Sequence, residues 1–168
     1  MLTQLIGLLA VLMCIGLAVL VIKRARRRGL VLSNIAEGRH TTGNVSKLTD
    51  AAITTRYLVV KKGTDDSHVA VANAQADVPI GVVTDEAAAA EANVNVFICG
   101  SGEGTVFMVA AGTIAVGDWL FCGASAAGKV SAIAGTAGTY FPIGRALTAG
   151  AANDLIEVAT HPAIKFVQ

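Results

Sequence analysis

Short apolar runs separated by turn residues fill the chain from about residue 45 to residue 168. Several runs alternate apolar and polar positions, as in Val94, Val96 and Ile98, which places every second side chain on one face of a strand. Glycine, asparagine, serine and threonine between the runs are typical of turns. The pattern predicts an all-β domain over 45–168, a small barrel or sandwich, with strands near 56–60, 68–72, 80–84, 94–99, 105–109, 118–122, 129–133, 141–147 and 155–159.

A weak internal repeat organises these strands. The motif Pro-Ile-Gly occurs at 79–81 and again at 142–144, and Tyr-Leu-Val at 57–59 matches Trp-Leu-Phe at 119–121. Proline at the start of a strand loses no ladder hydrogen bond, and glycine within a strand permits a bulge or a close backbone crossing. We therefore expect two similar β-units in which Gly81 and Gly144 are equivalent.

The first 22 residues carry no charged side chain, and a basic cluster follows them: Lys23, Arg24, Arg26, Arg27 and Arg28. As one helix this stretch would be about 33 Å long, enough to cross the hydrocarbon core of a bilayer. The charge follows the apolar run instead of preceding it, which disfavours a cleavable signal peptide. We predict a single apolar N-terminal α-helix with a basic flank over 1–28 and a linker over 29–44.

Two environments could hide this helix from water. In a membrane, lipid would be the partner of residues 1–28, and the basic cluster would hold the β-domain on the cytoplasmic side. In a protein assembly, the small residues Gly7, Ala10, Gly16 and Ala18 would let copies of the helix pack closely. A wrongly assigned start site is the third interpretation.

Composition narrows the possible functions of the β-domain. Hydrophobic residues make up 54% of the chain, but aromatic residues only 5%, so the apolar content is mostly small and aliphatic. Outside the basic cluster, eight basic residues face twelve acidic ones. Because binding to nucleic acid depends on clustered lysine and arginine, we expect no nucleic-acid face on the β-domain.

Residues that could carry chemistry are dispersed. His40, His68 and His161 show no metal-ligand spacing. Ser101 lies in a glycine-rich turn, but the lysine and the helix start of a phosphate-binding loop do not follow it. These residues therefore predict neither a metal site nor a phosphate site.

The remaining candidates also favour a structural interpretation. The carboxylates at 85, 86 and 91 stand in an alanine-rich stretch with nothing to tune them, which is typical of a charged loop. Cys14, Cys99 and Cys122 are interpreted as buried small apolar side chains, with a Cys99–Cys122 disulfide as the alternative. We predict that the protein is not an enzyme, has no catalytic, cofactor-binding or metal-binding residues, and needs no cofactor.

The stretch from about 70 to 162 resembles the phage capsid decoration, or cement, proteins. The resemblance lies in Pro-Ile-Gly-Val-Val at 79–83, an acidic alanine-rich connection and the strand at 94–97, followed by similar text at 110–120, 126–130 and 143–147. It implies a barrel-like subunit on the outside of a capsid lattice, a homo-oligomer and often a trimer, that clamps neighbouring major capsid proteins. It implies no cofactor and no active site.

We therefore expect a structural assembly protein, a decoration subunit on the surface of a phage-like particle. The alternative is a membrane-anchored or filament-forming β-domain that assembles through its N-terminal helix. A membrane-tethered enzyme or ligand-binding domain is the third interpretation. In each case, the chain is expected to act through other copies of itself, a capsid protein, other assembly subunits or lipid.

Overall fold

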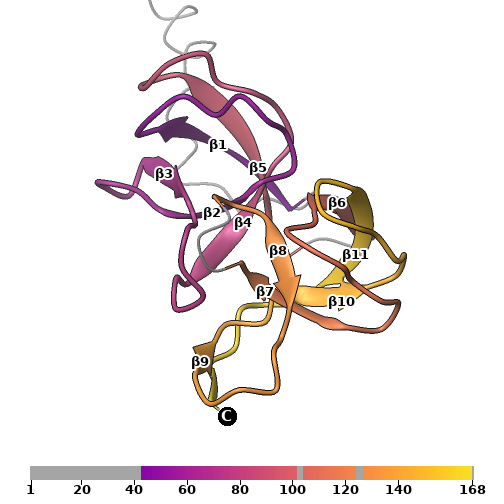
Figure 1. Ribbon diagram of the computed structural model, residues 1–168. Helices are drawn as coiled ribbons and strands as arrows, with labels where there is room; N and C mark the ends of the chain where they lie inside the picture. Colours follow the sequence, from indigo (N-terminus) through magenta and orange to yellow (C-terminus); the bar gives the residue numbers. More distant parts are fainter. Residues whose placement is uncertain (1–42, 102–103, 124–126, 168) are drawn as a thin grey trace, which may run out of the picture. The chain divides into compact units, whose positions relative to one another are not determined.

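The computed structural model describes residues 43–101, 104–123 and 127–167, and all of its regular structure is β-strand. The predicted N-terminal helix over 1–28 and nearly all of the predicted linker over 29–44 lie outside these residues. Nowhere in the three described ranges is there a helix that could cross a bilayer. The all-β prediction is confirmed, and most of the strands belong to two β-units (Figure 1).

The first β-unit is a closed barrel, coloured indigo to magenta in Figure 1. Its strands neighbour one another in the order β1-β3-β2-β4-β5, and β1 pairs with β5 to complete the circle. Strands β1 and β3 run parallel, with Leu48 opposite His68 and Thr49 opposite Val69. The strands are β1 (Asn44–Thr49), β2 (Val59–Lys62), β3 (His68–Val71), β4 (Pro79–Val83) and β5 (Asn93–Ile98).

Apolar side chains at alternate strand positions fill the interior of this barrel. On β5, Val94 and Val96 are buried, whereas Asn93 is exposed and Asn95 half-buried. Burial of each such valine contributes about 1.5–3 kcal/mol relative to exposure. The interior cluster is aliphatic and consists of Ile53, Leu58, Val60, Val69, Val83, Ala87, Val94, Val96 and Val109.

The second β-unit repeats this topology. Its strands follow the order β6-β11-β10-β7-β8. This is the order of the first unit read around the circle in the other direction, β1-β5-β4-β2-β3, with each strand replaced by its later counterpart. They are β6 (Thr105–Val109), β7 (Trp119–Cys122), β8 (Val130–Ala132), β10 (Gly144–Ala146) and β11 (Leu155–Thr160). A separate two-stranded sheet joins β9 (Thr139–Tyr140) to β12 (Phe166–Val167).

The two Pro-Ile-Gly glycines have the same surroundings. Gly81 lies opposite Ile98, and Gly144 lies opposite Thr160. A Cβ atom added at Gly81 would come within 2.7 Å of Val96 Cγ1 and would also collide with the backbone of the facing strand; at Gly144 it would meet Val158 Cγ1 at 2.7 Å and the same backbone obstacle. The predicted duplication and the equivalence of the two glycines are therefore confirmed.

One part of the predicted repeat is wrong by two residues. Val59 lies opposite Val82, and Trp119 lies opposite Arg145, so the counterpart of Trp119 is Val59 and not Tyr57. Tyr57 corresponds instead to Gly117, and both have a left-handed backbone, with φ of 63° and 89°. A shift of two residues keeps every side chain on the same face of a strand, so the apolar pattern at 57–59 fits both alignments of the repeat.

The two units close differently. In the first, Leu48 N donates to Ser67 O at 2.9 Å along the β1–β3 pair. In the second, a bridge between Ala110 and Val130 is all that joins β6 to β8 among the described residues. The seam beyond that bridge is filled by the first unit, because Val109 N donates to Tyr57 O at 3.3 Å.

Part of the outward surface of the first barrel, at strand β2, is buried against the second unit. Val60 points into the barrel, whereas its neighbour Val59 belongs to the larger core cluster with Leu120, Met108 and Ile143 of the second unit. Strand β2 is consequently covered on both sides. The described residues from 43 onward thus share a continuous packed interior rather than forming two independent barrels.

Candidate functional site

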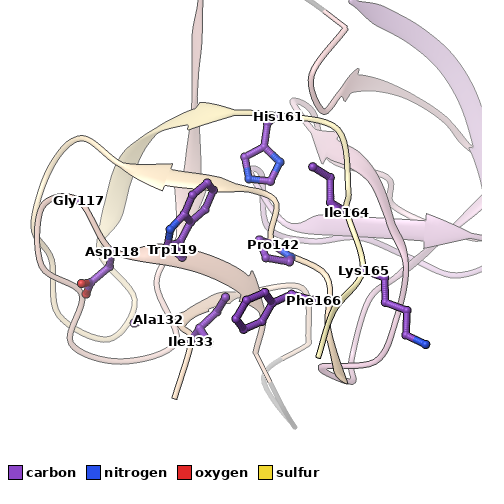
Figure 2. A pocket seen from close by; sticks show the side chains of 10 residues that line it. All are labelled: Gly117, Asp118, Trp119, Ala132, Ile133, Pro142, His161, Ile164, Lys165 and Phe166. Atoms are coloured by element: carbon purple, nitrogen blue, oxygen red, sulfur yellow. The ribbon is translucent and has the colours of Figure 1, made fainter. Parts of the chain in front are cut away.

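A cavity of about 540 Å³ opens on the second β-unit (Figure 2). One wall comes from the sheet, with Trp119 and Ile133, and the other from the C-terminal segment, with Ile164 and Phe166. The β9–β12 pairing of Tyr140 with Phe166 holds that segment beside the sheet. The cavity is lined by Gly117, Asp118, Trp119, Ala132, Ile133, Pro142, His161, Ile164, Lys165 and Phe166.

Trp119 is the centre of this site. The Arg145 guanidinium lies over its ring, with Cζ 4.3 Å from the ring centroid, because the two residues face each other across β7 and β10. The His161 ring meets it edge-on, at 5.0 Å between centroids and 70° between planes. Trp119 nevertheless stays 42% exposed. By contrast, Phe121, two positions along the strand, is buried against Tyr140 at 4.9 Å.

His161 offers the cavity an unpaired nitrogen. Its Nδ1 lies 2.7 Å from the carbonyl oxygen of Pro162. Since a carbonyl only accepts, Nδ1 is the donor in this contact. Nε2 is buried and bonds to none of the described residues.

Charges near the cavity are mostly positive. Lys165 is one of its lining residues, and Figure 2 shows its side chain directed away from the cavity centre. Arg145 is exposed and lies on the Trp119 ring. The carboxylate of Asp118 points away in Figure 2 and accepts from Ala115 N at 2.8 Å. An apolar ligand carrying a carboxylate or a main-chain carbonyl suits these surroundings.

His68, the second histidine among the described residues, serves the barrel. It is 9% exposed, with Nδ1 2.7 Å from Asp65 Oδ1 and Nε2 3.1 Å from Glu91 Oε1. Hydrogen bonds to these two carboxylates raise the pKa of His68. The second unit has a similar brace at the corresponding place, where Lys129 Nζ donates to Asn153 Oδ1 at 2.6 Å. We interpret both pairs as braces between a turn and a loop.

The other residues considered from the sequence are scattered. Asp85 accepts from Asn95 N at 2.6 Å, and Glu86 pairs with Arg56 at 3.6 Å, so with Glu91 on His68 the three carboxylates do not converge. Ser101 sits in a turn, where its hydroxyl donates to Ile98 O at 2.8 Å. Within the three described ranges, no group of three His, Cys, Asp or Glu side chains could hold a metal ion.

Cys99 and Cys122 are buried small side chains, as the sequence predicts. Cys99 and Cys122 are both buried and free, so the alternative of a disulfide between them is wrong. Loss of solvent raises the pKa of each thiol to about 12. At neutral pH neither is a nucleophile, because the thiolate is the reactive form. Cys14 and His40 lie outside the described residues.

Sequence reasoning missed the cavity. From the sequence we expect one of Trp119 and Phe121 in the core and the other at an interface or under a loop, and Trp119 is the exposed one. His161 enters the sequence analysis as one of three dispersed histidines. Ile133, Pro142 and Phe166 come from three further segments, and the pairing of β9 with β12 brings two of these segments together. The aliphatic counterpart of Trp119 is Val59, and only the strand pairing shows this correspondence.

Comparisons with known proteins identify a fold. No model of a protein family matches the sequence, and no curated protein matches it. Among solved structures, the chain is similar to the head fiber gp8.5 N base in bacteriophage phi29, with a TM-score of 0.53 and 16% identity. The similarity covers 73% of this chain and 98% of that one. The chain therefore shares the fold of that base.

Proposed function

We propose that this chain is a structural subunit on the outside of a phage-like head, a decoration or cement protein, and not an enzyme. The observation that carries the proposal is the shared fold, which extends over 98% of a phage head fiber base. The likeness of residues 70–162 to capsid decoration proteins points the same way. Fold alone does not determine function, so the site and an experiment must support it.

The site fits this role. Its apolar and aromatic lining, the two free thiols that burial holds unreactive, and the separated carboxylates suit binding to a protein better than turnover of a substrate. Partners in this proposal are other copies of the chain, a trimer being the arrangement that the decoration family suggests, and the major capsid protein. The β-domain would supply the contacts with these partners.

Particles assembled with and without the gene for this chain provide the test. Cryo-electron microscopy of wild-type particles should show density on the outer head surface that is absent from particles lacking the chain. A matched control is a particle complemented with the wild-type gene, in which the density returns. If purified particles contain none of the chain, the proposal is wrong.

A second candidate rests on the uncharged stretch over 1–22, which is long enough to cross a bilayer. In this case, the protein is a membrane-anchored or filament-forming β-domain. Flotation of the full chain with lipid vesicles distinguishes the candidates: the anchored protein floats with the vesicles, and replacing two leucines of 1–22 by arginine releases it. A decoration subunit stays with the particle fraction in both forms.

A further inference from the structure

The exposed face around Trp119 has a covered counterpart in the same molecule. Val59 corresponds to Trp119, and Ala72 to Ile133, because Ala72 N donates to Val59 O at 3.0 Å and Ile133 N donates to Trp119 O at 2.9 Å. Val59 and Ala72 are fully buried, whereas Trp119 is 42% exposed and Ile133 half-buried. The fold therefore presents the same face twice, once covered and once open.

A single residue bridges the polar main-chain groups of the first face. Gly128, in the turn between β7 and β8, accepts from Val59 N at 2.7 Å and donates to Ala72 O at 2.5 Å. Its backbone is left-handed, with φ of 78°, and an added Cβ would lie 2.8 Å from both Leu58 Cβ and Val71 Cγ1. Only glycine fits this position. The turn thus docks through its main chain and not through a side chain.

The corresponding groups on the second face are unbridged. Because the N–H and C=O of one residue in a strand point to the same side, Trp119 N–H is directed toward Ile133, as its carbonyl is. Among the described residues, none bonds to both Trp119 N–H and Ile133 C=O in the way that Gly128 bonds to Val59 N–H and Ala72 C=O. Both residues line the 540 Å³ cavity, which leaves room for a turn to enter.

We propose that this cavity is a docking site for a glycine-bearing turn of another protein. The glycine accepts from Trp119 N–H and donates to Ile133 C=O, while apolar neighbours fill the space between Ile164 and Phe166. The occupant is recognised by its main chain, as in the established contact of Gly128.

A second copy of this chain does not supply that turn. Its Gly128 is already bonded to Val59 and Ala72 of its own first unit. The corresponding turn of its first unit has Ser67 in place of Gly128, and Ser67 O is bonded to Leu48 N. Both turns that correspond to this contact are therefore engaged within the molecule, which favours a turn of a different protein as the occupant.

Trp119 reports on the test directly, because it is the only tryptophan of the chain. The probe is a head-to-tail cyclic peptide with the sequence of 121–131, serine replacing the cysteine. It is titrated into the full chain, in a detergent that leaves the Trp119 emission unchanged. We expect a saturable shift of the emission, and a peptide N-methylated at the Gly128 position should bind at least about tenfold more weakly, since it lacks the donor.

Two variants of the chain locate the binding. Ile164 is 63% exposed and lines the cavity, whereas Leu155 is 53% exposed and does not. Both tolerate a polar residue without loss of fold because both already face water. Ile164→Asp should weaken peptide binding about tenfold, and Leu155→Asp should leave it unchanged.

Three results would overturn the proposal: no saturable emission change, equal binding of the N-methylated peptide, or equal effects of the two variants. Concentration-dependent sedimentation of the chain alone, accompanied by the Trp119 shift, would assign the face to a second copy and also reject the stated occupant. The titration involves no particle, so its outcome is separate from the test of the proposed function.

Discussion

Val59 and Trp119 occupy corresponding positions in two copies of one fold, and their surroundings differ completely. Val59 is sealed under the second β-unit, and Trp119 lies open beside a cavity. The strands beneath them have the same order and the same hydrogen-bonded neighbours. The difference therefore comes from what covers each strand, and it shows how a duplicated fold can use one face for internal packing and the other for contact with a partner.

Substitutions at the two Pro-Ile-Gly glycines should have the largest effect, and they test whether the two units are equivalent. We expect Gly81→Val and Gly144→Val each to destabilise the fold by about 3 kcal/mol or more, because the new side chain would collide with the facing strand. Chemical denaturation followed by circular dichroism measures the loss. Gly112→Ala is the control, with open space around the glycine and an expected effect within about 0.5 kcal/mol. Tolerance of valine at one glycine alone would argue against equivalent positions.

Truncating the paired residues sharpens the contrast. Val59→Ala removes two buried methyl groups and should cost about 2 kcal/mol of unfolding free energy. Trp119→Ala should cost less than about 1 kcal/mol, despite the larger side chain removed, because Trp119 is half-exposed. Urea unfolding of both variants tests this order. A larger loss at Trp119 would mean that its ring stabilises the second unit as a core residue.

The two braces predict a difference in pH dependence. Because Asp65 and Glu91 raise the folded-state pKa of His68, the stabilisation from protonated His68 is complete below about pH 6.5 and is lost as the pH rises through the higher folded pKa. Melting temperatures of the wild type and His68→Gln should therefore differ most near pH 5.5 and converge toward pH 9. In His68→Lys, which imitates Lys129 of the second unit, this loss above about pH 6.5 should disappear. A constant difference between wild type and His68→Gln would contradict the prediction.

The smallest expected effect concerns the Arg145 contact. Val82 holds the corresponding place in the first unit and is buried, whereas Arg145 lies in solvent over the Trp119 ring. Arg145→Met should lower stability by about 0.5–1 kcal/mol through loss of the cation–π contact. Arg145→Lys should keep part of it. No measurable loss in the methionine variant would leave this contact without a role in stability.

The sequence predicted the features that depend on local pattern. Alternation at 94–98 located a strand. Pro-Ile-Gly identified two equivalent glycines because the facing strand approaches too closely to leave room for a Cβ. Strand β1 was missed, since its residues Asn-Val-Ser-Lys-Leu-Thr are half-polar and only one of them is fully buried. Local alternation also could not show that Val59 is the counterpart of Trp119. A shift of two residues in the alignment of the repeats leaves each side chain on the same face of its strand, so both alignments have the same apolar pattern.

The cavity required information that no local pattern contains. Its walls depend on the pairing of Tyr140 with Phe166 and on the stacking of Trp119 with His161, contacts between segments far apart in the sequence. The parallel pairing of β1 with β3 is non-local in the same way. Residue types at these positions are ordinary for exposed strands and termini, so only their meeting in space makes a site.

The unequal closure of the two units bears on how the chain folds during synthesis. A ribosome releases the first unit before the second, and the first can complete its circle of strands from its own residues. The second unit cannot close from its own residues alone, because its open edges hydrogen-bond to Tyr57–Val59 of the first unit. The earlier half thus acts as a template for the later one, and a rearranged gene that encoded the second unit first would release an unsealed sheet with a bare edge, open to pairing with other nascent chains.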